Sequence, residues 1–163
     1  MGKSLKEGVI MLIHKAGDIL QAKENIICHQ VNEDGVMGGG LAKSIANLYP
    51  KVEKQYKKFC ETVEYNKSLI GHYIVTNIGT HKYIASCFTQ DDFVTDLKVI
   101  RTVFSGLIES CKLNGFSIAI PYKYGCGIAK GNWEEVSKLF EALSNEYGVD
   151  VSVYKLGVKN VKD

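Results

Sequence analysis

The sequence lacks a long hydrophobic run, an internal repeat and a low-complexity segment. No apolar stretch approaches the roughly 20 residues that a membrane-spanning helix needs, so no membrane partner is expected. The 163 residues include only 2 prolines, and 45% of them are hydrophobic and 23% are charged. That composition is ordinary for a globular protein with a packed core, and the length predicts a single domain over residues 1–163.

A surplus of one charge sign is also missing. The 20 basic and 18 acidic residues leave a net charge of +2, which gives no strong signal for nucleic-acid binding. The N-terminal stretch MGKSLKEGVIMLIHK has no small-residue cleavage site, and Lys6 breaks its partial likeness to a myristoylation signal. We therefore expect a cytoplasmic protein, and a monomer.

The five cysteines form no pattern that predicts disulfide bonds or a structural metal site. Their number is odd, their spacing is scattered and no CxxC pair occurs, which argues against a disulfide framework or a structural zinc site. The histidines His14, His72 and His81 show no metal-ligand spacing. Neither a metal nor a cofactor is expected.

Apolar, β-branched stretches alternate with stretches of helical periodicity. The alternation predicts an α/β protein of three layers, α/β/α, with a central mixed, largely parallel sheet covered on both faces. Strands are predicted at 9–15, 25–31, 71–78, 82–88, 116–122 and 149–156, with the fourth joined to the third in a hairpin. Helices are predicted around 41–49, 51–61, 97–111 and 133–143.

Several residues predict helix ends. Thr95 is a plausible N-cap for the third helix, and the Asn-Gly pair ending at Gly115 is typical of its C-terminus. Asn132, with Glu135 three residues on, resembles a capping box for the fourth helix. Pro50 ends the first helix or begins the second, since proline suits a first helical turn.

Two glycine-rich loops each follow a predicted strand and lead into a helix. They read NEDGVMGGGLA (32–42) and YKYGCGIAKG (122–131). Glycine lets backbone N–H groups approach a ligand closely, and a helix N-terminus attracts anions. Ligands of such sheets bind at the carboxyl ends of the strands, so two phosphates or a diphosphate fit between the loops. Surface turns use glycine freely, and that interpretation stays open.

The first loop fits neither of two familiar phosphate motifs. A P-loop needs Gly-Lys-Ser/Thr, but Ala42 precedes Lys43 and Ser44. A GxGxxG fingerprint fits Gly38 and Gly40 but has Lys43 in its last place. The phosphate, if one binds, is therefore held in another way.

Three stretches together resemble the macrodomain, the ADP-ribose-binding module. They are KAGDIL (15–20), ICHQVNEDGVMGGGLA (27–42) and IPYKYGCGIAKGNWEEV (120–136), and their order and spacing match from about Lys15 to the last strand. The resemblance implies the three-layer macrodomain fold, with ADP-ribose or an ADP-ribosylated substrate as the partner. It calls for no cofactor.

The resemblance also implies a set of binding residues. Asp18 would accept a hydrogen bond from the adenine amino group, with Ile19 beside it, and Asn32 would lie near the distal ribose. Phe88 and Tyr124 would pack against the ribose or adenine. By their residue types alone, Asp18 fits a turn or helix cap, Asn32 an Asx turn, and the two aromatics the core. The phosphate loops would be formed by Gly35, Val36, Met37, Gly38, Gly39, Gly40 and Leu41, and by Gly125, Cys126, Gly127, Ile128 and Ala129.

The same stretches bear on catalysis. One macrodomain branch uses a lysine after the strand that corresponds to YIASC and an aspartate in the second loop. This chain reads CFTQDD there and has Ala129 in place of the aspartate, so a covalent lysine mechanism is not expected. The stretches GGGLAKSIANLYPKVEKQYKKFC and ASCFTQDDF resemble instead the branch that includes ADP-ribose 1″-phosphate phosphatases.

Two functions follow as hypotheses. The first is a hydrolase of ADP-ribose 1″-phosphate or of ADP-ribosyl groups on acidic side chains, and the second is an ADP-ribose-binding module without turnover. A nucleotide-binding protein of another type remains a third. The catalytic candidates are Asn32 for orientation, Asp91 or Asp92 as base, Gln90 and Thr89 as polar supports, and Asp34 as another base. Adjacent loop carboxylates such as Asp91 and Asp92 are also common as solvated groups.

Three nucleophile and base candidates are less favoured. Cys28 and His29 are neighbours on one strand and should point to opposite faces, so they form no nucleophile–base pair. Cys126 lies between glycines at a helix start, a place that can activate a thiol. The family resemblance instead implies a backbone role for that position.

Overall fold

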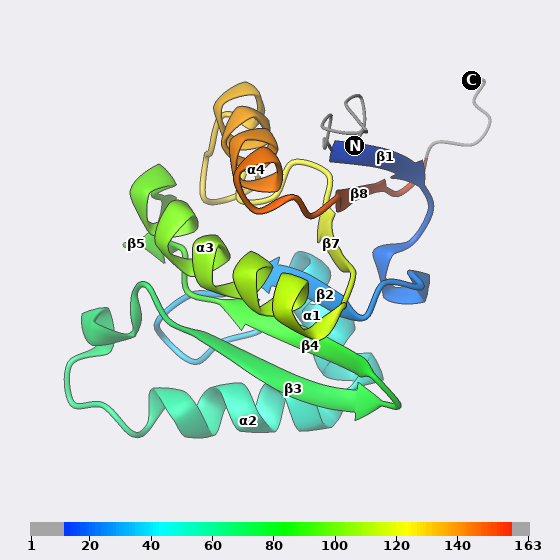
Figure 1. Cartoon of the computed structure of the whole chain (residues 1–163). Helices are drawn as coiled ribbons and strands as arrows, with labels where there is room; N and C mark the ends of the chain where they lie inside the picture. The colour runs from blue at the N-terminus through cyan, green and yellow to red at the C-terminus, as the bar shows by residue number, and fades with distance from the viewer. Residues whose placement is uncertain (1–11, 158–163) are drawn as a thin grey trace, which may run out of the picture.

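The computed structural model describes residues 12–157, which form a six-stranded sheet between two layers of helices (Figure 1). The first predicted strand, 9–15, thus begins outside the described residues. The strand order is β1-β8-β7-β2-β4-β3, in which β3 alone runs antiparallel to its neighbour. The strands are β1 (Leu12–Ala16), β2 (Ile26–Gln30), β3 (Tyr73–Gly79), β4 (Lys82–Cys87), β7 (Ile118–Pro121) and β8 (Val151–Lys155).

Two pairs of helices cover the two faces of the sheet (Figure 1). Helices α3 (Leu97–Asn114) and α4 (Trp133–Tyr147) bury their apolar stripes on one face, and α1 (Gly40–Leu48) and α2 (Pro50–Cys60) on the other. Successive side chains of β2 point to opposite faces of the sheet and so enter both cores. Cys28 lies in the α3/α4 core and Ile27 in the α1/α2 core, each with no exposed surface. The predicted three-layer α/β/α architecture is therefore confirmed.

Two short 3-10 helices and a small hairpin complete the structure. The 3-10 helices are η2 (Ile19–Gln21) and η3 (Asn66–Leu69), and the hairpin pairs β5 (Gln90–Asp91) with β6 (Val94–Thr95). No helix in residues 12–157 combines the length and the apolar character needed to span a bilayer.

The predicted N-cap of α3 is one residue away from the observed one. Asp96 caps the helix, because its Oδ1 accepts hydrogen bonds from the backbone N–H groups of Lys98, at 2.9 Å, and Val99, at 3.3 Å. The Thr95 hydroxyl instead donates to the carbonyl oxygen of Gly125. The prediction that Thr95 is the cap is thus wrong, since a distant loop engages its side chain.

The other predicted helix ends are borne out. Gly115 closes α3 in a left-handed conformation with φ of 68°, and Pro50 is the first residue of α2. Asn132 caps α4 by accepting a hydrogen bond from the Glu135 N–H at 3.2 Å. Near the end of α1, Leu48 is 54% exposed and lies outside the α1/α2 core.

Five parallel strands end on the same edge of the sheet, and this edge positions the candidate site. Strands β1, β2, β4, β7 and β8 all run in one direction, so the segments after them lie along their common carboxyl edge. The segments after β1, β2, β4 and β7 begin with Gly17, Val31, Phe88 and Tyr122, respectively. Both glycine-rich loops and the β5–β6 hairpin therefore leave the sheet at the edge where ligands of α/β proteins bind.

Candidate functional site

Asn32 organises the first glycine-rich loop. Its Oδ1 accepts hydrogen bonds from the N–H groups of Asp34, at 2.9 Å, and Val36, at 3.4 Å, and its Nδ2 donates to the Val36 carbonyl at 2.9 Å. The hydroxyl of Tyr56 on α2 lies 2.7 Å from the Asn32 carbonyl oxygen and 2.8 Å from its Oδ1. The Asx-turn interpretation is therefore confirmed, and Asn32 shapes the loop backbone.

The first loop reaches the start of α1 without a side-chain cap. Gly39 is the N-cap and offers no side chain, so no side-chain hydrogen bond engages the first N–H groups of the helix. Met37 is only 4% exposed and packs into the α1/α2 core, whereas Val36 is 56% exposed. The buried methionine anchors the loop, and the helix start stays available for an anion.

The second glycine-rich loop is held closed by its own backbone and by β6. Gly131 donates its N–H to the Gly125 carbonyl at 2.9 Å, and Thr95 donates its N–H to the Ala129 carbonyl at 3.0 Å. Gly125 adopts φ of 72°, and a Cβ there would lie 2.8 Å from the Thr95 Oγ1. Only glycine fits this position without strain. The β5–β6 hairpin and the second loop thus form one bonded unit.

A buried amide network fixes the base of the hairpin. The Gln30 side chain donates from Nε2 to the Gln90 Oε1, at 3.0 Å, and to the Thr95 Oγ1, at 3.2 Å. The Thr89 hydroxyl donates to the Gln30 Oε1 at 2.6 Å. Gln90 is 7% exposed, so its side chain serves first to hold the hairpin. Contact between Gln90 or Thr89 and a substrate stays a prediction.

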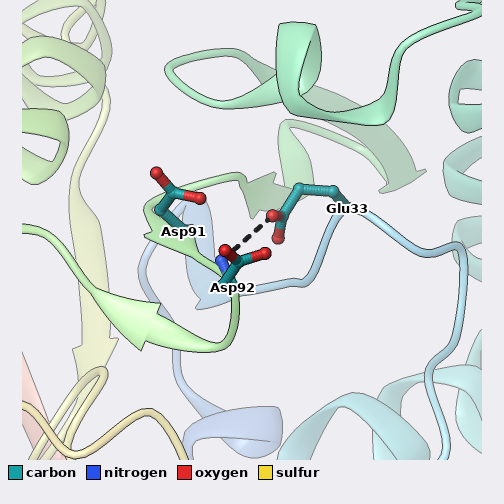
Figure 2. Close-up of side chains that lie close together, drawn as sticks. All are labelled: Glu33, Asp91 and Asp92. Carbon is teal, nitrogen blue, oxygen red and sulfur yellow. Dashed lines mark hydrogen bonds between the residues drawn. The ribbon is translucent and has the colours of Figure 1, made fainter.

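Three carboxylates from the first loop and the hairpin gather above this base (Figure 2). Glu33, Asp91 and Asp92 each place an oxygen within 4.8 Å of the others, and the Asp92 N–H donates to the Glu33 Oε2 at 3.3 Å. Glu33 is buried, whereas Asp91 and Asp92 are exposed. The structure thus brings the sequence-predicted aspartates together with a glutamate that adjoins Asn32.

Lys67 of η3 neutralises part of this cluster. Its ammonium contacts the carboxylate of Asp91 and lies 2.9 Å from the Asp92 Oδ1. The hydrogen bonds from Lys67 to Asp91 and Asp92 raise the pKa of Lys67, so it stays charged. The other carboxylate, Glu33, has no lysine or arginine partner within residues 12–157. Burial and the absence of a cationic partner among residues 12–157 therefore set Glu33 apart from the two aspartates.

Comparison with known proteins identifies the fold family. No family model matches the sequence. The chain is 26% identical over 145 residues to an ADP-ribose 1″-phosphate phosphatase of Lodderomyces elongisporus, covering 81% of this chain and 87% of that one. It is 27% identical to the solved macrodomain of Mycobacterium tuberculosis DarG, with a TM-score of 0.77 over 89% of this chain and 97% of that one. The chain is a macrodomain.

A second curated relative extends well beyond this macrodomain. The DNA ADP-ribosyl glycohydrolase of Mycobacterium tuberculosis is 30% identical over 152 residues, which are 88% of this chain but only 42% of that protein. The macrodomain therefore spans less than half of that relative.

The two predicted aromatic contacts lie in the cores of the macrodomain. Tyr124 is 1% exposed and packs edge-on against Phe104, with ring centroids 5.4 Å apart, while its hydroxyl lies 2.7 Å from the Thr89 Oγ1. Phe88 has no exposed surface and packs near Tyr56 at 5.8 Å. Of the two interpretations of these rings, the structure supports the core role, since neither ring presents a face to solvent.

Asp18 caps η2 directly after β1. Its Oδ1 accepts a hydrogen bond from the Leu20 N–H at 2.9 Å, so the helix-cap interpretation is confirmed. Ile19 is 6% exposed and fixes this turn in the α1/α2 core. The Asp18 side chain itself is exposed at the carboxyl edge of the sheet. A contact with adenine stays a prediction.

The cysteine and histidine candidates are structural. His29 is buried with its Nε2 2.8 Å from the Ser86 Oγ, and burial lowers its pKa to about 3. Cys28 lies in the opposite core, so the predicted separation of the two side chains is confirmed. Burial also raises the pKa of the Cys126 thiol, whose Sγ lies 3.3 Å from the Tyr124 carbonyl. Neither arrangement activates a thiolate.

Sequence reasoning missed Lys67 and Tyr56 and did not single out Glu33. The position of Glu33 between Asn32 and Asp34 was a signal, because a polar residue inside a ligand-binding loop is worth testing. No sequence pattern links Lys67 to Asp91, which lies 24 residues away and meets it only in the folded chain. In the same way, Asn66 donates to the Asp34 Oδ1 at 2.9 Å. The segment η3 thus ties the first loop to the hairpin.

Proposed function

We propose that this macrodomain binds ADP-ribose across its two glycine-rich loops and hydrolyses an ADP-ribose derivative at or next to the anomeric carbon. The observation that carries the proposal is the arrangement at the carboxyl edge. Strands β2 and β7 are parallel neighbours, so the loops that follow them lie on either side of one stretch of the carboxyl edge. Asp91 and Asp92 follow β4, the other neighbour of β2, and join Glu33 in the carboxylate cluster. The two relatives described above, an ADP-ribose 1″-phosphate phosphatase and a DNA ADP-ribosyl glycohydrolase, both act on ADP-ribose derivatives, which supports the same assignment.

The binding half of the proposal uses backbone groups. The loops 35–41 and 125–129 hold a diphosphate from two sides through backbone N–H groups other than those of Val36 and Cys126, which already donate within the loops. The uncapped start of α1 adds its partial positive charge. Asp18 accepts a hydrogen bond from the adenine amino group, beside the buried Ile19. Asn32 acts by shaping the first loop near the distal ribose, since its side-chain oxygen already accepts loop hydrogen bonds.

The catalytic half uses the carboxylates. One of Glu33, Asp91 and Asp92 takes a proton from water as the water oxygen bonds to the anomeric carbon or to the 1″-phosphorus. The bond from that atom to the leaving oxygen breaks, and the leaving oxygen keeps the electron pair. Glu33 is best placed as this base, because it is buried and Lys67 engages the other two. The substrate is ADP-ribose 1″-phosphate or an ADP-ribosyl group on an acidic side chain.

A second candidate is an ADP-ribose reader without turnover. Two observations favour it. The chain has no lysine in CFTQDD and has Ala129 where the lysine-dependent branch carries an aspartate. Asp91 and Asp92 are also both paired with the charged Lys67, so their carboxylates are already engaged.

Incubation with two substrates separates these functions. We expect the protein to release phosphate from ADP-ribose 1″-phosphate or ADP-ribose from glutamate-linked ADP-ribosylated protein, as measured by chromatography of the products. Calorimetry with ADP-ribose on the same sample shows whether the site is intact. Tight binding of ADP-ribose with no turnover of either substrate would contradict the proposed hydrolase activity. The second candidate, an ADP-ribose reader without turnover, would then stand.

A further inference from the structure

The tip of the β5–β6 hairpin displays a strained, exposed phenylalanine. Asp91 pairs with Val94, so Asp92 and Phe93 form a two-residue turn, with φ of 50° and 64°. Such turns favour Asn-Gly or Asp-Gly, because both central residues need positive φ. A bulky side chain at positive φ is uncommon, and the strain it carries is a reason to look for a function. Phe93 is also 48% exposed, so burial of its ring offsets little of that strain.

The hairpin cannot swing away from the site, because both of its strands are bonded to their surroundings. On one side, Asp91 of β5 and Asp92 of the turn contact Lys67, and the Asp92 N–H donates to Glu33. On the other, Thr95 is bonded to the second loop. Phe93 lies between these anchored strands, next in sequence to a member of the carboxylate cluster. Its backbone is thus fixed directly after the carboxylate cluster in the chain.

The hairpin and the second loop carry two more exposed apolar side chains. Val94 is 53% exposed and Ile128 is 85% exposed. They are chain neighbours of Thr95 and Ala129, whose backbones are joined by a 3.0 Å hydrogen bond. Phe93, Val94 and Ile128 are thus exposed apolar side chains on the two segments that this hydrogen bond joins. A free phosphate has no apolar surface that such side chains would contact.

We propose that Phe93 is a specificity-determining residue that contacts the group bonded to the anomeric carbon, and that this group belongs to a polypeptide. The inference rests on the proposed function and chooses between its two substrates. Three carboxylates with one ammonium adjoin Phe93, so the 1″-phosphate and the phosphates of a nucleic acid are both repelled there. A peptide with apolar side chains beside the modified residue can contact the exposed Phe93 ring and brings no further negative charge to the carboxylates.

Substitution at this position separates binding from folding. Phe93→Asn removes the ring and suits positive φ, so its thermal midpoint should equal or exceed that of the parent. Phe93→Tyr keeps the ring. Leu113→Asn is a matched control, because Leu113 is 79% exposed at the far end of α3. The probes are ADP-ribose, ADP-ribose 1″-phosphate, an ADP-ribosylated oligonucleotide, and an apolar peptide that carries ADP-ribose through a non-hydrolysable amide link.

Calorimetry with these probes tests the proposal even without turnover. We expect Phe93→Asn to lower the affinity ratio of peptide adduct to free ADP-ribose roughly tenfold, in line with truncation of an aromatic contact residue. Phe93→Tyr should restore the ratio, and Leu113→Asn should leave it unchanged. A ratio that is equal in the parent and Phe93→Asn overturns the inference, as does a parent that prefers the oligonucleotide or the 1″-phosphate. A parent that binds no ADP-ribose overturns the proposed function as well.

Discussion

Glu33→Gln is expected to lower turnover of the ADP-ribose derivative by about 100-fold to 10,000-fold, the usual contribution of a general base. Glutamine keeps the shape of the side chain and an oxygen that can accept the hydrogen bond from the Asp92 N–H. It cannot take a proton from water. The loss should therefore fall on kcat, while calorimetry shows little change in the affinity for ADP-ribose.

Variants of the neighbouring carboxylates serve as the comparison. Asp91→Asn and Asp92→Asn should cost less turnover than Glu33→Gln, because Lys67 already holds both aspartates as ion-paired carboxylates. Glu64→Gln is a matched control at an exposed glutamate. If the double variant of Asp91 and Asp92 loses turnover while Glu33→Gln keeps it, the base is one of the hairpin aspartates. Full turnover in Asp91→Asn, Asp92→Asn and Glu33→Gln, and in the double variant, would show that no carboxylate of this cluster is the base.

Gly125→Ala should have the largest effect on binding. A methyl group at this positive φ would lie 2.8 Å from the Thr95 Oγ1 and 3.3 Å from the Gln30 Oε1, so the loop or the hairpin must shift. Each lost hydrogen bond from the loop to a charged phosphate costs about 1.5–3 kcal/mol. We therefore expect the affinity for ADP-ribose to fall at least about tenfold, measured by calorimetry.

The same loop supplies the control for that substitution. A Cβ at Gly127 meets nothing within 4 Å, and its φ is not in the left-handed region. Gly127→Ala should therefore bind ADP-ribose within about threefold of the parent, because small changes at open surface positions are usually worth under about 0.5 kcal/mol. Equal affinities for the two alanine variants would contradict the role given to the backbone conformation at Gly125.

The sequence predicted the elements whose causes are local. Alternating β-branched and helical stretches placed the strands and helices, and Asn132 and Gly115 fixed helix ends through contacts within a few residues. The cap of α3 was placed wrongly because two polar residues, Thr95 and Asp96, stand side by side. A tertiary contact decides between them, since Gly125 engages the Thr95 hydroxyl.

The candidate site likewise has parts with local causes, which the sequence predicts, and parts that depend on tertiary contacts, which it does not. Its two glycine-rich loops are continuous in sequence and were predicted with their strands and helices. The carboxylate cluster was predicted only at Asp91 and Asp92, because the burial of Glu33 and the ion pairs of Lys67 arise from packing between segments distant in the chain. The strain at Phe93 is likewise invisible before the hairpin register is known.

Titration of the unmodified protein with ADP-ribose and with AMP is the most direct test of a cleft that grips a diphosphate with two loops. We expect ADP-ribose to bind at least about tenfold more tightly than AMP, which lacks the second phosphate and distal ribose, a difference of about 1.4 kcal/mol or more. Asp18→Ala should weaken the binding of both. Equal affinity for AMP and ADP-ribose, or an Asp18→Ala variant that binds as tightly as the parent, would contradict the proposed cleft.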